Sequence, residues 1–186
     1  MSIDQSEKCR LKGRKIFLRS PINEDCSEFL TLIKKSTPIY SALNCPIKRK
    51  GQFEDYLQRC LADDYFGFLI CRNEDNIILG NINLFNIVKR RLQNACIGYY
   101  VGVEYARKGY ATEALQLVVR FAFQNLKLHR IEANIQPQNT ASLSLIKRCG
   151  FSCEGYSPRY LKIGAKWCDH ERWAILREDW GKICRK

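Results

Sequence analysis

The feature that most constrains this 186-residue chain is a strand–turn–helix pattern near its centre. Residues 95–103 form an almost unbroken apolar run, which is typical of a strand buried on both faces of a sheet. A short basic turn that contains Gly109 follows, and residues 111–125 then show an amphipathic helical pattern. The apolar side chains of that pattern are Leu115, Val118, Val119, Ala122 and Leu126. A buried strand that leads directly into such a helix is characteristic of α/β folds.

The rest of the chain also alternates between strand and helix patterns. Apolar and β-branched runs predict strands over residues 15–20, 65–72, 77–87 and 130–135, and a closing hairpin over 152–161 and 166–176. Helical spacing predicts helices over 24–35 (capped by Asn23), 51–62 and from Asn139 to Cys149, where Gly150 provides a C-terminal cap. Residues 36–50 include two prolines and are expected to be irregular, as part of a substrate-gating loop.

These elements predict one α/β (α+β) domain, in which helices flank a central mixed sheet. We assign residues 1–14 to an N-terminal extension, residues 15–182 to the domain and residues 183–186 to a C-terminal tail. No apolar run approaches the roughly 18 residues that a transmembrane helix needs. The N-terminal residues lack the apolar core of a signal peptide, so a cytoplasmic protein is expected and no membrane partner.

The composition limits the classes of site that the chain can carry. Its ten cysteines are dispersed without a C-x2-C pair, and there are only two histidines, so we expect reduced structural cysteines and no metal site. The formal net charge of +12 favours polyanionic partners in general. Because the basic residues are dispersed rather than clustered, no direct contact with nucleic acid is expected.

The basic turn carries the clearest chemical signal. It reads Arg107, Lys108, Gly109, Tyr110, Ala111 and Thr112, at the start of the predicted helix. A helix N-terminus offers unpaired N–H groups and partial positive charge, and Gly109 allows an anion to approach the backbone closely. The turn matches neither the Walker loop nor the dinucleotide-binding fingerprint. Taken alone, it is equally well explained as a tight turn before a capped helix.

Residues 98–114, which include this turn, resemble the acetyl-CoA motif of the GCN5-related N-acetyltransferase (GNAT) superfamily. Similar stretches follow at the family's spacing, over residues 129–133, 137–142 and 149–151. The tail, with residues 154–156, 160–161 and 167–170, is similar to the Rim-type branch, which acetylates N-terminal residues of ribosomal proteins. The resemblance spans nearly the whole chain.

The resemblance implies a cofactor, acetyl-CoA, and residues that hold it. Two central strands, 95–103 and 130–135, would splay around the pantetheine arm, and backbone groups of Val101 and Val103 would bind it. The amides of residues 107–112 would hold the pyrophosphate, and Asn139 matches the family asparagine that contacts CoA. One departure is Ala106, where family members often have Gln or Arg. Since amides do most of the phosphate binding, we expect little loss.

The catalytic residues are less sharply defined. Ser142 matches a family serine near the CoA sulfur, where its hydroxyl would donate to the leaving thiolate, although it equally suits a helix start. For the base, the matched carboxylates are Glu132 and Asp169, each of which also suits a structural ion pair. Some relatives carry a carboxylate at position 159, which is arginine here. Glu113 is better explained by the helix dipole.

The first functional hypothesis is an N-acetyltransferase that modifies the α-amine of a protein, including a ribosomal protein. A second is an acetyltransferase for a small amine, such as a polyamine or an antibiotic. A third, from another class, is a non-catalytic module that binds CoA or RNA. The sequence is compatible with a monomer or a homodimer.

Overall fold

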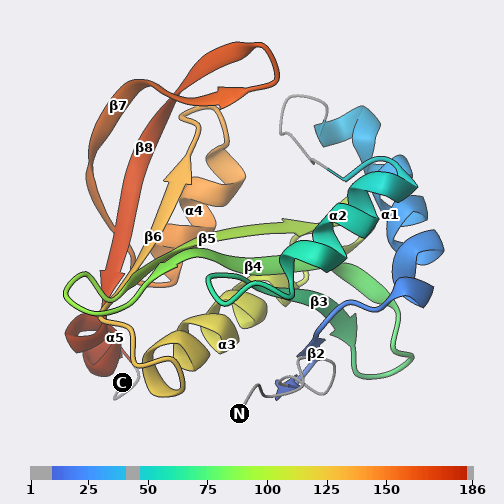
Figure 1. Cartoon of the computed structure of the whole chain (residues 1–186), viewed down its shortest axis with the longest axis horizontal. Helices are drawn as coiled ribbons and strands as arrows, with labels where there is room; N and C mark the ends of the chain where they lie inside the picture. The colour runs from blue at the N-terminus through green and yellow to red at the C-terminus, as the bar shows by residue number, and fades with distance from the viewer. Residues whose placement is uncertain (1–9, 41–46, 184–186) are drawn as a thin grey trace. The chain divides into compact units, whose positions relative to one another are not determined.

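The computed structural model describes residues 10–40 and 47–183 (Figure 1). Its sheet has eight strands in the order β1-β2-β3-β4-β5-β6-β8-β7. They are β1 (Leu11–Lys12), β2 (Ile16–Arg19), β3 (Phe66–Arg72), β4 (Ile78–Val88), β5 (Asn94–Val101), β6 (Arg130–Ile135), β7 (Ser152–Ile163) and β8 (Lys166–Leu176). The β5–β6 pair is parallel, whereas β6–β8 and β7–β8 are antiparallel. The expected α/β class with a mixed sheet is confirmed.

Four helices follow the predicted order with shifted ends, and a fifth, which follows β8, was not predicted. They are α1 (Cys26–Tyr40), α2 (Lys50–Arg59), α3 (Tyr110–Gln124), α4 (Thr140–Arg148) and α5 (Arg177–Ile183), with 3-10 turns η2 (Asn23–Asp25) and η3 (Val103–Tyr105). The prediction that residues 36–50 are irregular is wrong for 36–40, which continue α1; residues 41–46 lie outside the described residues. The predicted cap Asn23 is also wrong, because the Asp25 carboxylate accepts the Ile22 amide at 2.8 Å.

The chain forms two compact units. The first comprises Met1–Phe85 and Gly98–Val118. Its core gathers aromatic and aliphatic side chains of α1 and α2 with those of β2, β3 and β4, including the fully buried Phe29, Phe53 and Leu69. β1 pairs with β2, which extends the sheet into the segment assigned to the N-terminal extension.

The second unit comprises Asn86–Ile97 and Val119–Lys186. Its β6, predicted as a strand, alternates in burial, since Ile131, Ala133 and Ile135 are buried and the residues between them are half-buried. α4 lies beside β6, and the ring centroids of Phe123 and Trp180 are 5.6 Å apart. Across residues 10–40 and 47–183, no helix combines the length and apolar character that crossing a membrane would require.

Candidate active site

The predicted anion site, residues 107–112, is a tight turn that leads into α3. Arg107 and Gly109 have positive φ angles of 62° and 87°, and the helix begins at Tyr110. Left-handed residues next to right-handed ones turn successive amides toward one side, which is the geometry of backbone anion nests. The first amides of a helix also lack intrahelical acceptors. Both features suit the binding of phosphate oxygens.

The space over Gly109 is open. A Cβ added at this glycine would meet, within 4 Å, only the Nζ atom of Lys15 at 3.9 Å. Arg107 and Lys108, which precede Gly109 in the turn, are both exposed. The backbone at Gly109 is therefore accessible from the open side of the turn.

Basic side chains from other elements of the same unit surround this turn. The Lys15 ammonium donates to the Lys108 carbonyl at 3.3 Å. The Arg72 guanidinium lies 5.9 Å from the centre of the Tyr105 ring, and the Lys108 ammonium lies 5.7 Å from the same centre. The carboxylate of Asp75 is paired with Arg72. Lys15 thus adds positive charge to that of the turn's own residues, which favours an anionic ligand, whereas the charge of Arg72 is balanced by Asp75.

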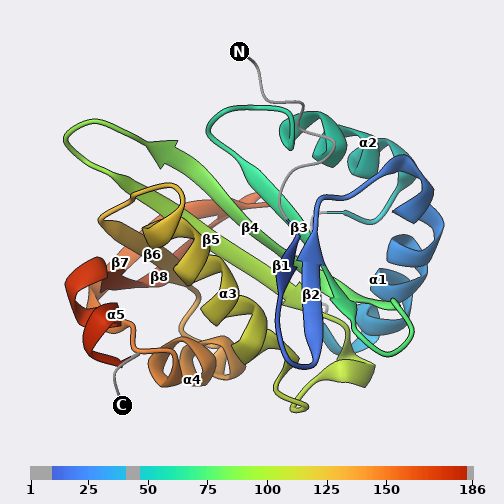
Figure 2. The ribbon, with the colours of Figure 1, turned by 90° about the horizontal axis from the view of Figure 1, so that it is seen from below.

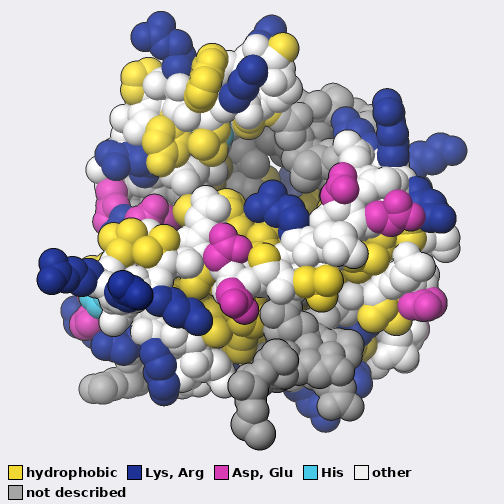
Figure 3. Space-filling model, in the orientation of Figure 1, with side chains coloured by type: hydrophobic (Ala, Val, Ile, Leu, Met, Phe, Trp, Pro, Cys, Tyr) yellow, Lys and Arg dark blue, Asp and Glu magenta, His cyan; other side chains and the backbone are white. Residues whose placement is uncertain are grey.

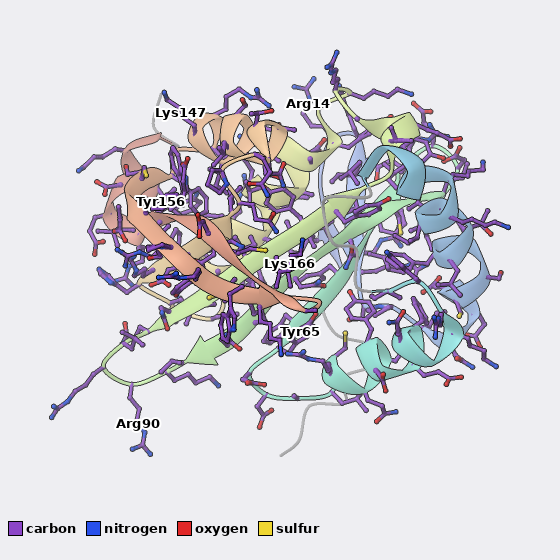
Figure 4. All side chains as sticks on the ribbon, turned by 90° about the horizontal axis from the view of Figure 1, so that it is seen from above. Arg14, Tyr65, Arg90, Lys147, Tyr156 and Lys166 are labelled. Atoms are coloured by element: carbon purple, nitrogen blue, oxygen red, sulfur yellow. The ribbon has the colours of Figure 1, made fainter. Side chains whose placement is uncertain are left out.

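Glu113 has a structural role that the sequence did not reveal. In the first turn of α3, its carboxylate accepts the backbone N–H groups of Arg14 and Lys15, the latter at 3.1 Å. It thereby joins the turn between β1 and β2 to the start of α3, the region shown in Figure 2. Arg14 is labelled at this junction in Figure 4. The helix dipole alone does not account for this carboxylate.

The end of β5 presents peptide groups on the edge opposite β4. The Gly102 N–H donates to the Leu79 carbonyl of β4 at 2.8 Å. The Tyr100 carbonyl oxygen lies close to Gly80, since a Cβ added to Gly80 would be 2.0 Å from that oxygen. Because successive residues in a strand direct their peptide groups to opposite edges, those of Val101 face away from β4. The described ladder with β6 ends at Cys96, so it does not reach Val101.

The backbone of Val103 is used differently. Its N–H donates to the Ser36 hydroxyl at 3.1 Å, and its carbonyl accepts the N–H of Ala106 at 3.2 Å. Ser36 is fully buried on α1 and donates in turn to the Leu32 carbonyl at 3.0 Å. Of the two valines predicted to bind pantetheine, Val103 therefore has its N–H and carbonyl engaged by other residues of the chain.

Asn139 and Ser142 lie together at the start of α4. The Asn139 side-chain oxygen accepts the Ser142 N–H at 3.1 Å, so Asn139 is the N-cap of this helix. Both residues are half-buried. The partial positive charge of a helix N-terminus would stabilise negative charge that develops beside Ser142.

Glu132, the first candidate base, belongs to a charged network on β6. It accepts from the Arg130 guanidinium at 2.7 Å and from the Asn94 side-chain amide at 3.4 Å. The same guanidinium also binds Glu154, at 2.8 Å to one carboxylate oxygen, and this hydrogen bond lowers the pKa of Glu154. Glu132 is thus held in an ion pair with Arg130.

Asp169, the second candidate base, lies in the β7–β8 hairpin. It accepts the Tyr156 hydroxyl and, at 2.7 Å, the Arg159 N–H. The hydrogen bonds from Tyr156 and Arg159 lower the pKa of the Asp169 carboxyl. The neighbouring His170 is buried, with its Nδ1 atom 2.9 Å from the Cys168 carbonyl. Both candidate carboxylates are therefore engaged by partners within their own unit.

The cysteines show no special chemistry in the part of the chain that the structure describes. The seven described cysteines are free, and burial raises the pKa of the Cys60 thiol to about 12 and that of Cys149 to about 11. Such thiols stay protonated near neutral pH. Within the same residues, no cluster of His, Cys, Asp or Glu side chains is suited to a metal ion. Cys9, Cys45 and Cys184 lie outside the described residues.

Comparison with known proteins gives the family. The Acetyltransferase (GNAT) domain matches residues 15–152 of the chain. A probable N-acetyltransferase of Bacillus subtilis, YjcK, is 33% identical over 177 residues, which cover 91% of this chain and 98% of the relative. The uS5-alanine N-acetyltransferase of Escherichia coli is 35% identical over 116 residues, which cover 62% of this chain and 59% of that protein.

Solved structures share the fold. RimJ of Mycobacterium smegmatis, in complex with CoA-disulfide, has a TM-score of 0.77 at 25% identity, covering 88% of this chain and 82% of RimJ. A spermidine N-acetyltransferase of Vibrio cholerae, in complex with CoA and spermine, has a TM-score of 0.75 at 21% identity, covering 89% and 98%. The chain thus belongs to the GNAT acetyltransferases and is an acetyl-CoA-dependent N-acetyltransferase.

Proposed function

We propose that this enzyme acetylates the N-terminal α-amine of a protein, with a ribosomal protein as the first candidate. The observation that carries the proposal is that both matched carboxylates, Glu132 and Asp169, are held by hydrogen-bonding partners. An enzyme without a strong free base does best with an amine that is already partly neutral.

The ionisation of the two kinds of protein amine separates them. An α-amine has a pKa of about 7.7–8.0 and is roughly 10–20% neutral at pH 7, whereas a lysine amine, with a pKa of about 10.4, is far below 1% neutral. The difference corresponds to roughly 3.5 kcal/mol of deprotonation free energy. The α-amine can lose its proton to solvent and attack without a dedicated base.

The residues of the turn and of β5 would hold and activate the donor. Acetyl-CoA supplies the acetyl group as a thioester. The amides of residues 107–112 bind the pyrophosphate, with Arg107 and Lys108 adding charge, and Asn139 contacts CoA. The N–H of Val101 donates to the thioester carbonyl, where negative charge develops as the amine attacks.

Ser142 would assist the departure of the thiolate. The amine nitrogen forms a bond to the acetyl carbon as the carbon–sulfur bond breaks, and the nitrogen then loses a proton. The Ser142 hydroxyl donates a hydrogen bond to the sulfur and relays that proton to it, giving an acetylated amine and a free thiol. In this scheme Glu132 and Asp169 hold β6 and the hairpin in place.

The relatives support a protein substrate. The uS5-alanine N-acetyltransferase is similar in sequence, although it is matched over only 59% of its own length, and RimJ shares the fold. The spermidine acetyltransferase is under 25% identical, so its likeness concerns the fold alone. A polyamine would also need free carboxylates, and those of β6 and the hairpin are engaged.

The proposal is tested with a panel of acceptors at equal concentration. Peptides with Ala, Ser or Thr at a free N-terminus are compared with spermidine and an aminoglycoside, with release of CoA thiol as the readout. We expect the peptides to be turned over at least tenfold faster, by kcat/KM. Turnover of spermidine alone would overturn the proposal in favour of a small-amine enzyme.

A further inference from the structure

We propose that Lys15 binds a phosphate of the CoA moiety and that Glu113 is the residue that positions it. The inference rests on the proposed use of the 107–112 turn as the pyrophosphate site. It adds a part of the molecule distant in sequence, the hairpin of β1 and β2, to the cofactor site.

The Lys15 side chain lies beside the 107–112 turn. Its ammonium donates to the Lys108 carbonyl at 3.3 Å and is the group nearest to the open side of Gly109. Any phosphate that reaches the amides after Gly109 comes within reach of this ammonium. An ammonium has three N–H donors, and the contact with Lys108 occupies one of them. The side chain is exposed, so it can turn toward a ligand without losing a buried contact.

The anchoring of the hairpin is the second argument. Glu113 accepts the N–H groups of both Arg14 and Lys15, and the Lys15 N–H contacts both carboxylate oxygens, at 3.1 and 3.3 Å. A glycine at position 13 leaves room for this carboxylate, because a Cβ on Gly13 would lie 2.2 Å from a Glu113 carboxylate oxygen. The backbone of Lys15 is therefore fixed to the first turn of the same helix whose N-terminus faces the anion.

In this arrangement we expect Glu113 to strengthen anion binding, although its carboxylate is negatively charged. A carboxylate near an anion site normally weakens anion binding, because like charges repel. Here both oxygens of the Glu113 carboxylate accept backbone N–H groups of the β1–β2 hairpin, and loss of the carboxylate would free the backbone that carries Lys15. Removal of this negative charge is therefore expected to weaken CoA binding rather than to strengthen it.

The test of Lys15 is a calorimetric titration with CoA and with 3′-dephospho-CoA. Lys15→Gln should bind CoA about fivefold to tenfold more weakly than the wild type, the range expected for one solvent-exposed hydrogen bond. If the contact is to the 3′-phosphate, the loss vanishes with 3′-dephospho-CoA; if it is to the pyrophosphate, the loss persists. Both results support the proposal.

The matched control is Lys12→Gln on the same hairpin. Lys12 is exposed and changes the net charge equally, but its ladder partner is Phe17 rather than the turn. This variant should keep the wild-type Kd for CoA. Equal Kd values for Lys15→Gln and the wild type, or equal losses in the two variants, would overturn the specific role of Lys15.

Glu113→Ala and Glu113→Gln test the positioning role. We expect Ala to weaken CoA binding at least fivefold and Gln to restore part of it, because a Gln carbonyl can still accept one amide. Tighter binding in either variant would contradict the proposal. Circular dichroism checks folding, and Lys15→Gln keeps the test valid if Glu113→Ala unfolds. Because the readout is binding of CoA, the result is independent of which amine the enzyme acetylates.

Discussion

The turn before α3 and the β7–β8 hairpin represent two different ways to build a binding surface. The turn offers backbone amides, held by contacts from residues far away in the sequence, such as Glu113 with Arg14. The hairpin offers side chains: Tyr156, Tyr160, Leu161 and Trp167 are between 40% and 59% exposed. Figure 3 shows hydrophobic and basic side chains together over this hairpin, on which Figure 4 labels Tyr156 and Lys166.

The difference indicates that the backbone of the turn is suited to one ligand, whereas the side chains of the hairpin can differ between substrates. Backbone amides bind a phosphate whatever the side chains are, and we propose that those of the turn bind the cofactor. Side-chain surfaces can change with little effect on the backbone. The carboxylate of Asp169 is engaged, while Arg159, Lys162 and Lys166 are exposed. We expect the hairpin to contact the acceptor and not CoA.

The largest effect is expected from Gly109→Glu. This substitution puts a side chain at a φ of 87° and a negative charge beside the pyrophosphate, so CoA binding should weaken at least ~100-fold. Calorimetry with CoA measures the change. Gly164→Glu is the matched control, since Gly164 also has a positive φ of 60° and open space around it but lies in the hairpin turn. Equal losses of CoA affinity in the two variants would contradict the assignment of CoA binding to the turn rather than to the hairpin.

Ser142→Ala should act on chemistry rather than on binding. Loss of the hydroxyl is expected to lower kcat by roughly 10- to 100-fold, within the range of general acid–base contributions. The Kd for acetyl-CoA should stay within about twofold of the wild type. Steady-state kinetics with a peptide acceptor, alongside calorimetry, separates the two. A rise in Kd with unchanged kcat would instead assign Ser142 to cofactor binding or to the helix start.

The pH dependence should follow the acceptor. Below the α-amine pKa of about 7.7–8.0, kcat/KM for a peptide should rise about tenfold per pH unit, and it should level off above that pKa.

The Asp169 pKa is lowered by its hydrogen bonds, so its carboxylate stays charged across this range. The contribution of these bonds to stability is present above the unfolded-state pKa and is lost only as the pH falls through the lowered folded-state value. A further inflection between pH 6 and 9 would point to a base that this account lacks.

The smallest effect is expected from Trp167→Ala at the hairpin. Trp167 is 59% exposed, so its loss should raise the KM for a peptide about fivefold and leave CoA binding unchanged. Leu92→Ala, which removes a side chain of similar exposure (54%) from the β4–β5 turn, should change neither. A change in CoA affinity with Trp167→Ala would contradict the division between the two regions.

Local signals in the sequence predicted a large part of the fold and of the candidate site. The apolar and β-branched residues of 130–135 predicted β6 with its observed bounds, and Asn139 caps α4 as its position before a helical pattern indicates. The 107–112 turn could be found because its glycine, its basic residues and the following helix are adjacent in the chain. Each of these features depends on neighbouring residues.

Long-range contacts could not be predicted in the same way. Lys15 and Lys108 are 93 residues apart, and Ser36 and Val103 are 67 apart, so no local pattern joins them. α1 also continues past residue 35, where the two prolines of residues 36–50 had indicated irregular structure, and its Ser36 is fully buried. The engagement of Asp169 likewise depends on the register of β7 and β8.

The most direct test of the central claim uses one peptide that carries both kinds of amine. A peptide with a free N-terminal alanine and an internal lysine is incubated with the enzyme and acetyl-CoA, and tandem mass spectrometry locates the added acetyl group. We predict acetylation of the N-terminal α-amine, with the lysine left unmodified. Acetylation of the lysine, or no acetylation of the peptide while spermidine is turned over, would contradict the account.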